Sequence, residues 1–260
     1  MANKPNINPE NIGAGLGELK SRLLFLLFAI FVYRIGTHIP VPGIDPLQLQ
    51  AFFEQNEGTF AGLFNMFSGG ALERMSIVAL GIMPYISASI IMQLLTAVSP
   101  QLDQLKKEGE SGRRKITQYT RYGALALATV QGTGMTVGLL APIAYNPGLA
   151  FNLTAIISLV TGAMFLMWLG EQITEKGIGN GISMLIFAGI VALFPAAVGS
   201  SLTQAYEGQI SGVLLLIVGL IAVGVIAGIV YVERAQRRIT VNYAKRQQGR
   251  KMYQAQASHL

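Results

Sequence analysis

The chain has 260 residues, of which 52% are hydrophobic and only 12% are charged, about half the charged share of an ordinary soluble domain. Its mean hydropathy is +0.48, and its apolar residues form long blocks without an amphipathic period, which indicates an integral membrane protein. The absence of cysteine excludes disulfides and thiolate metal sites, and two histidines are too few for a typical metal centre, so we expect no cofactor. The net charge of +6 matters through where the charges lie.

Six apolar blocks follow a polar N-terminal segment, residues 1–22. The length of each block is close to the length that a helix needs to cross a bilayer. The blocks cover residues 23–41, 76–98, 123–143, 149–169, 182–198 and 211–232. Because backbone polar groups in lipid must be satisfied within the segment, we expect an all-α, polytopic helix bundle with six spans. Pro84 lies inside the second block, where it would remove a backbone hydrogen bond and bend the helix.

Basic residues alternate between the connectors. Seventeen Lys and Arg residues lie in the N-terminal segment and in the connectors after the second, fourth and sixth blocks, whereas the opposite connectors hold only Arg74. The positive-inside rule therefore predicts a cytoplasmic N-terminus and an even number of spans. Arg34 lies inside the first block, where it needs a partner, a wet cavity or a route to the interface. It either anchors helix packing or touches a substrate pathway.

A short apolar stretch precedes the second block. It reads GLFNMFSGGALER over residues 62–74 and has only eleven residues before its first charge, far too few to span a bilayer. Gly69 and Gly70 interrupt its helical periodicity. The stretch alone is compatible with an amphipathic segment at the membrane interface.

Two pairs of isoleucines share one spacing. Ile82 and Ile86, in the second block, and Ile182 and Ile186, in the fifth, are each four residues apart, so each pair stacks on one helix face. In an ordinary bundle such pairs belong to the core or to the lipid-facing surface. Arranged around a water channel, they would form a constriction that loses its water and blocks ions.

Two segments are strongly basic, the connector 102–123 and the C-terminal segment 233–260. Three interpretations remain open for both. The charges can set the topology beside anionic lipid, bind the phosphates of structured RNA, or dock a cytosolic protein. The sequence VNYAKRQQGRK at 241–251 can also form an extended or hairpin structure, which topology alone would not require.

Five stretches together resemble one family. They read FNMFSGGAL, ALGIMPYISASIIMQLL, KKEGESGRRKITQYTRYG, TGAMFLMWLGEQITEKGIGNGIS and VNYAKRQQGRK, and they are similar to SecY, the central subunit of the bacterial protein-conducting channel. The resemblance implies ten spans in two inverted halves of five. This chain would supply the first half, residues 23–198, the sixth helix, residues 211–232, and part of the cytoplasmic loop that follows, residues 233–260.

The resemblance also implies a function and partners. The expected protein is a channel subunit, and no enzyme, that conducts unfolded polypeptides across the bacterial plasma membrane and releases signal and transmembrane segments sideways into it. The implied partners are SecE, SecG, the motor ATPase SecA, the ribosome with its RNA and proteins, the nascent or secretory polypeptide, and membrane lipids.

Three groups of residues acquire expected roles from the resemblance. The plug, a short re-entrant helix at about 60–72, would include Phe60, Leu63, Phe64, Met66, Phe67, Gly69 and Gly70. The hydrophobic pore ring would include Ile82, Ile86, Ile182 and Ile186. The loops that receive the ribosome and SecA would include Lys106, Lys107, Arg113, Arg114, Lys115, Arg238, Lys245, Arg246, Arg250 and Lys251.

Three other functions compete with a channel. The first is an ion-coupled secondary transporter, which would also have inverted repeats and interrupted helices. Coupled transport places ionisable groups near the midplane, and the second to sixth blocks contain no Asp, Glu, Lys or Arg. The second is a membrane enzyme that uses Glu171 and Glu175, although their place beside Lys176 favours solvated turn residues. The third is a ribosome receptor that conducts nothing.

Overall fold

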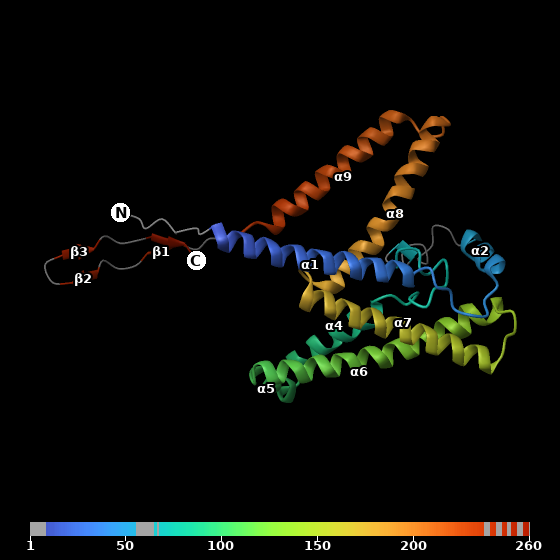
Figure 1. The fold of residues 1–260 in the computed structure, drawn as a ribbon, viewed down its shortest axis with the longest axis horizontal. Helices are drawn as coiled ribbons and strands as arrows, with labels where there is room; N and C mark the ends of the chain where they lie inside the picture. Colours follow the sequence, from blue (N-terminus) through green and yellow to red (C-terminus); the bar gives the residue numbers. More distant parts are fainter. Residues whose placement is uncertain are drawn as a thin grey trace. The chain divides into compact units, whose positions relative to one another are not determined.

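The computed structural model describes residues 9–55, 65–66 and 68–236, and four short strands between residues 240 and 259. The chain divides into two compact units, Met1–Ala196 and Ala197–Leu260. The described part of the first unit is helical apart from connecting turns, and Figure 1 shows its long helices. Most of the described residues of the chain are therefore α-helical, as the apolar blocks predicted.

The helices of the first unit begin with α1 (Pro9–Gly36) and α2 (Pro46–Gln55). Residues 68–82 form turns, and α4 (Met83–Val98), α5 (Pro100–Lys107) and α6 (Glu110–Met135) follow. A π-turn, Thr136–Leu140, and a 3₁₀ turn, Ala141–Ile143, extend α6. The unit continues with α7 (Leu149–Lys176) and the first part of α8 (Gly181–Tyr206), in which Pro195 lies next to the boundary between the units.

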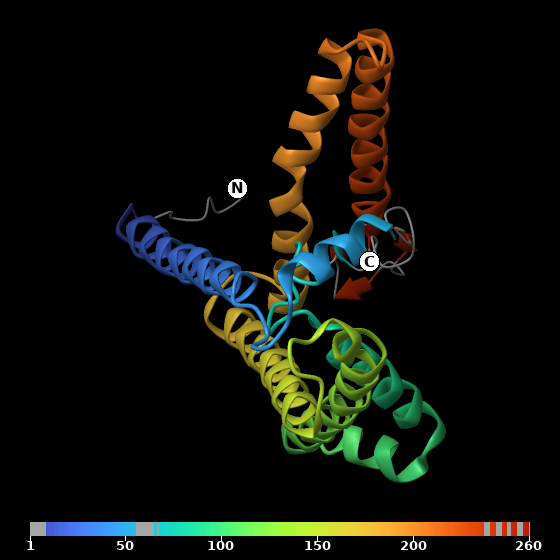
Figure 2. The ribbon, with the colours of Figure 1, turned by 90° about the vertical axis from the view of Figure 1, so that its right-hand side faces the viewer.

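Small residues bring α4, α6 and α7 into close contact. A Cβ on Gly123 of α6 would lie 3.5 Å from the Cβ of Ala88 on α4. A Cβ on Gly132 of α6 would lie 3.6 Å from a methyl group of Val160 on α7. Both views show α6 and α7 running side by side (Figures 1 and 2). Dispersion contacts of this kind are a main source of stability for helices in lipid, where water does not drive association.

Fewer helices than expected are long and apolar enough to span a membrane. Among the described residues four qualify, Glu110–Ile143, Leu149–Lys176, Gly181–Tyr206 and Gly212–Glu233. A fifth results if α4 and α5, bent by 99° at Ser99, count as one span. The six-span expectation counted α1, which ends at Gly36 and carries Lys20, Arg22 and Arg34 in or beside its apolar part. The helix α1 is therefore not among the candidate spans, because its apolar part carries more charged residues than that of the other long helices.

The second block is not one helix. Residues 76–82 form turns, and α4 begins only at Met83. The prediction that Pro84 bends a helix is wrong, because Pro84 lies in the first turn of α4, where its missing N–H has no intrahelical partner to lose. The proline therefore favours the start of α4. The turns upstream are held by the backbone, since Ile77 N donates to Ile39 O at 2.9 Å and Val41 N donates to Met75 O at 2.8 Å.

The second unit contains the end of α8, helix α9 (Gly212–Glu233) and the strands. Strand β1 (Thr240–Asn242) pairs with β4 (Ala257–His259), and β2 (Arg246–Gln248) pairs with β3 (Lys251–Tyr253), both antiparallel. In the chain, β2 and β3 lie between β1 and β4, and Figure 1 labels β1, β2 and β3. The stretch 241–251, which the sequence allows to be extended or a hairpin, contains described residues of β1, β2 and β3, all in antiparallel pairs.

Candidate functional site

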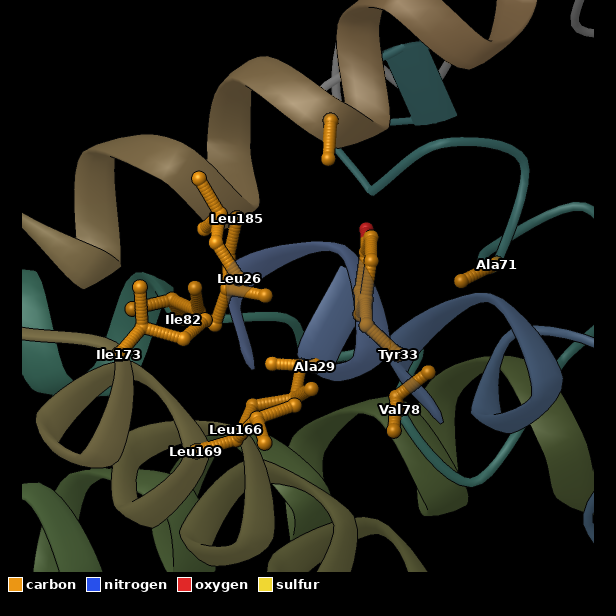
Figure 3. Packing of buried hydrophobic residues seen from close by; sticks show 11 residues of the cluster. Leu26, Ala29, Tyr33, Ala71, Val78, Ile82, Leu166, Leu169, Ile173 and Leu185 are labelled. Carbon is orange, nitrogen blue, oxygen red and sulfur yellow. The ribbon is translucent and has the colours of Figure 1, made fainter. Parts of the chain in front are cut away.

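Eleven buried side chains form a cluster, called here the central cluster, where α1, α7, α8 and the turns before α4 meet. Its members are Leu26, Ala29, Tyr33, Ala71, Val78, Ile82, Leu166, Leu169, Ile173, Leu185 and Ala188. Figure 3 shows them from close by, with side chains from α1, α7 and α8 directed toward one another. The cluster therefore joins elements that are far apart in the sequence.

All four isoleucines predicted for the pore ring lie in or against this cluster. Ile82 is a member and is 7% exposed, and Figure 3 shows it among the side chains of α7 and α8. Ile86, Ile182 and Ile186 are half-buried and pack against the cluster. The two pairs, which are about one hundred residues apart in sequence, thus share one region of the fold.

Local structure fixes where each isoleucine pair begins. Ile82 precedes the first residue of α4, and its carbonyl oxygen accepts a hydrogen bond from Ile86 N at 3.1 Å. At the start of α8 the side chain of Asn180 accepts from Ile182 N at 3.0 Å, as N-capping residues do. Gly170 of α7 leaves room for the second pair, because a Cβ there would lie 3.1 Å from a side-chain carbon of Ile182.

The predicted plug is only partly described. Phe60, Leu63, Phe64 and Phe67 lie outside the described residues, so the structure does not test their role. Met66 is 40% exposed, and Gly69 and Gly70 are buried with positive φ angles of +66° and +81°. Such angles favour glycine, because a side chain in this region of φ is strained.

Side-chain bonds hold together the described end of the predicted plug and the turns that follow it. The amide of Asn65 donates to a carboxylate oxygen of Glu73 at 3.0 Å, and its carbonyl oxygen accepts from Glu73 N at 3.0 Å. The hydroxyl of Ser68 donates to Asn65 O at 3.0 Å and accepts from Leu72 N at 3.2 Å. The described residues between 65 and 73 therefore form a compact loop, because Asn65 and Ser68 bond to Leu72 and Glu73.

The last turn of α1 holds this loop from the side. The Tyr33 hydroxyl donates to Ser68 O at 3.0 Å, and a guanidinium nitrogen of Arg34 donates to Gly69 O at 3.1 Å. Figure 3 shows the Tyr33 hydroxyl directed away from α1. Arg34, whose partner the sequence left open, therefore bonds to the predicted plug. Hydropathy does not reveal this contact, because its acceptor is a backbone carbonyl.

A second link joins the end of α1 to the loop. Arg74 donates to Nε2 of His38 at 2.8 Å, and Nδ1 of His38 lies 2.8 Å from Arg34 O. A carbonyl oxygen only accepts and a guanidinium only donates, so these bonds require the neutral imidazole with its proton on Nδ1. Beside this link lies a surface cavity of about 500 Å³, lined in part by His38, Leu49, Phe53 and Arg74.

The basic connector lies around the turn between α5 and α6. Lys106 and Lys107 end α5, where cations suit the negative end of the helix dipole, and Lys107 pairs with Asp103 at 2.7 Å. The three other predicted docking residues of the connector, Arg113, Arg114 and Lys115, are all exposed on α6. The segment thus presents its cations to solvent.

A surface cavity of about 640 Å³ lies on α6. Its lining residues are Glu110, Arg113, Arg114, Thr117, Gln118, Arg121 and Tyr122. Arg121 also makes a bidentate pair with Glu171 of α7, at 2.9 and 2.8 Å. Because Glu171 is held in this ion pair, its interpretation as one of two catalytic carboxylates loses support.

The docking residues of the C-terminal segment are described only in part. Arg246 begins β2 and pairs with Tyr253 in the strand register, while Lys251 pairs with Gln248. Arg238, Lys245 and Arg250 lie outside the described residues. Across the described part of the chain, no group of three or more His, Cys, Asp or Glu residues could hold a metal ion.

Comparison with known proteins points to one family. The model of the SecY family matches residues 76–260. The protein translocase subunit SecY of Pseudomonas aeruginosa is 67% identical over 247 residues, which cover 95% of this chain and 56% of the relative. The protein translocase subunit SecY of Escherichia coli K12 is 58% identical over 265 residues, which cover 100% of this chain and 60% of the relative. The chain thus spans little more than half the length of these two relatives.

Three solved structures share the fold. One, described as the structure of a protein conducting channel, matches with a TM-score of 0.62 at 22% identity and covers 92% of this chain and 52% of its own. Sec61 in a canine ribosome–channel complex matches with a TM-score of 0.62 at 23% identity. The match covers 85% of this chain and 49% of the Sec61 chain. A SecY structure that concerns the plug domain and the closed state matches with a TM-score of 0.51 at 21% identity. The match covers 91% of this chain and 52% of the SecY chain. At these identities the likeness establishes the fold alone.

Proposed function

The chain belongs to the SecY family, and we propose that it forms the first half and the sixth helix of a gated channel for unfolded polypeptides. In this proposal the channel lies in the bacterial inner membrane, conducts secretory chains across it and releases signal and transmembrane segments sideways into lipid. None of the 260 residues forms a GxxxxGK[ST] phosphate loop, so the energy for movement comes from a partner.

The gathering of the four isoleucines at the central cluster carries the proposal. Ile82 and Ile86 come from the start of α4 and Ile182 and Ile186 from the start of α8, so both helices bring apolar side chains to one place. A collar of such side chains closes around a polypeptide, while a bare ion cannot shed its water against hydrocarbon. The remaining members of the ring would come from helices of the other half of the channel.

We propose further that residues 60–72 are the plug that closes the channel from the outer side. Backbone that does not span the membrane is tolerated at membrane depth only inside protein or beside a cavity. The burial of Ser68, Gly69 and Gly70 against α1 and α8 supports such a position for the end of this segment. In the related SecY structure the plug domain is described as stabilising the closed state, which agrees with this assignment.

The two basic segments are proposed as the docking surface for the ribosome and for SecA, with SecE and SecG as further subunits of the complex. The exposed Arg113, Arg114 and Lys115 support this role, as does the hairpin that carries Arg246 and Lys251. Sec61, which shares the fold, is described in a ribosome–channel complex. The alternation of basic residues supports a cytoplasmic N-terminus, which places both segments on the partner's side.

Crosslinking of a stalled polypeptide tests the channel directly. A photoreactive side chain replaces Ile86 or, as a matched control on another face of the same helix, Ile91, which is 47% exposed. Both variants are made in the complete channel with its second half and partners. A chain stalled during translocation should crosslink strongly at position 86 and weakly at position 91. Equal yields at both positions, or uptake of a small solute driven by an ion gradient, would overturn the proposal.

A further inference from the structure

Within the first unit, the start of α8 is in direct backbone contact with α7. A Cβ on Gly181, the first residue of α8, would overlap the carbonyl oxygen of Gly170 on α7 and would lie 2.7 Å from the Cβ of Ile173. Gly181 is buried, and Ile173 is fully buried in the central cluster. Glycine at position 181 therefore lets α8 begin against the last turns of α7, at a distance that no side chain allows.

Thr174 of α7 joins the two helices by hydrogen bonds. Its hydroxyl donates to Gly170 O at 2.8 Å, one turn back on its own helix, and accepts from Gly181 N at 2.8 Å. The first N–H groups of a helix have no partner within the helix, and Gly181 is buried, so its N–H needs an acceptor from outside α8. The N–H of Ile182 is bonded within the turn, by Asn180, whereas the bond of Thr174 ties α8 to α7.

The second isoleucine pair begins at this contact. Ile182 follows Gly181 directly, and one of its side-chain carbons would lie 3.1 Å from a Cβ on Gly170. Ile186 lies one turn further along the same face of α8, and Leu185 beside it is fully buried in the central cluster. The position of the pair therefore follows from how Gly181 is held on α7.

We propose that Thr174 is a positioning residue of the pore ring: its hydroxyl holds the start of α8 on α7 and so sets where the second isoleucine pair lies. This inference rests on the proposed channel function and names a residue that controls one side of its constriction. An apolar constriction blocks ions only while it is narrow enough to lose its water. A small displacement of two of its side chains therefore raises the leak of the closed channel.

Thr174→Val tests the hydroxyl, because valine keeps the β-branched shape of threonine and removes both hydrogen bonds. Thr174→Ser keeps a hydroxyl and should preserve both bonds. Thr154→Val is the matched control, since it makes the same substitution on the same helix at a hydroxyl that donates within α7, to Ala150 O at 2.9 Å. All variants are made in the complete channel with its second half and partners.

Amide hydrogen exchange measures the contact without requiring conduction. Exchange of peptides that cover residues 181–186 is followed by mass spectrometry in the closed channel. The loss of one neutral hydrogen bond corresponds to a change of about fivefold, so Thr174→Val should speed this exchange about fivefold. Thr174→Ser and Thr154→Val should keep the reference rate. A peptide from α6 in each protein should also keep it, which separates a local change at α8 from general destabilisation.

Ion conductance of the same proteins measures the consequence for the channel. At equal amounts of folded channel, Thr174→Val should leak severalfold more than the reference in the closed state. Thr174→Ser and Thr154→Val should leak as little as the reference. A residue that only stabilised the fold would change the amount of folded protein and not the leak of each channel.

The two measurements together separate the two proposals. Faster exchange and a larger leak in Thr174→Val, both absent in Thr174→Ser, support the positioning role and the channel. Unchanged exchange in Thr174→Val, or equal effects of valine and serine, overturns the role of the hydroxyl, whatever the conductance. Faster exchange with a reference leak, in a channel that conducts once a partner and a secretory chain are added, overturns the positioning of the ring. Faster exchange with no conductance in any protein under those conditions supports the contact and overturns the channel.

Discussion

Gly162 of α7 lies directly against the carbonyl oxygen of Ile77, in the turns before α4. A Cβ on Gly162 would overlap this oxygen and its carbonyl carbon, so no residue other than glycine fits without a backbone shift. The contact explains how turns that are not helical can lie inside the bundle: they lie flat on a helix that has no side chain at that point. It also places Val78 in the central cluster, where it is 1% exposed.

Gly162→Ala should therefore destabilise the protein although alanine is the better helix former. Overpacking against backbone costs about 1–3 kcal/mol, which exceeds the gain in helix propensity of about 1 kcal/mol. The measurement is the unfolding midpoint in detergent. Gly134→Ala on α6 is the control, because a Cβ there has no atom within 4 Å among the described residues, and it should be neutral or mildly stabilising. A Gly162→Ala protein as stable as the control would contradict the contact.

Ile86→Asn should loosen the closed channel. A polar side chain in the ring keeps water at the constriction and lowers the barrier to ions. Planar-bilayer recordings of the complete channel should show a larger resting conductance, and export assays should show that weak signal sequences are accepted. The same change at Ile91 puts the polar group on an exposed part of another face of α4, and the resting conductance should stay at the reference level. Equal leaks in both variants would argue against the ring.

Reversing the charge of Arg246 and Arg250 together should weaken docking of the ribosome or SecA at least tenfold. Each phosphate contact that is lost removes counterion release and lowers the salt dependence of binding by roughly one unit of slope. Binding to vesicles that hold the complete channel is measured from low to physiological salt. Arg234→Glu, which lies directly after α9 and outside the hairpin, is the control. Unaltered affinity of the double variant at low salt would remove the docking role.

The ion pair of Arg121 and Glu171 should contribute little stability despite its bidentate geometry. The Arg121 side chain is 49% exposed and that of Glu171 is 21% exposed, so water screens the pair. A double-mutant cycle with Arg121→Gln and Glu171→Gln should give a coupling free energy of about 0.5–1 kcal/mol that falls with salt. A coupling several times larger and insensitive to salt would show that the link between α6 and α7 is effectively buried.

The sequence predicts well those features that depend on composition and spacing. The apolar blocks predict the helical class, and the local pattern at 241–251 allows the extended structure that is found in β1, β2 and β3. The resemblance predicts that Ile82, Ile86, Ile182 and Ile186 share a role, and the structure brings them to one cluster. Whether they line a pore remains a prediction, because the ring needs helices from the other half.

Features that depend on backbone contacts could not be predicted. Hydropathy treats residues 76–98 as one apolar block, but the backbone of Ile77 lies on Gly162, and the helix begins only at Met83. In the sequence Arg34 likewise looks like an isolated charge. Its acceptor is the backbone carbonyl of Gly69, a residue with positive φ, and the sequence does not show where that carbonyl points. In both cases the local structure depends on a close contact between segments that are distant in the sequence. The periodicity of hydrophobic residues gives no information about such a contact.

The shortness of α4 has a consequence for the surrounding bilayer. Its 16 residues rise about 24 Å, whereas the hydrocarbon layer is about 30 Å thick. At the other end the 99° bend into α5 prevents the helix from lengthening. If α4 crosses the bilayer, the missing depth would be made up by the turns of residues 76–82, whose peptide groups would be poorly tolerated by acyl chains. The turns pack against Gly36 of α1 and Gly162 of α7, so protein, and not lipid, surrounds the peptide groups of residues 76–82 on these sides.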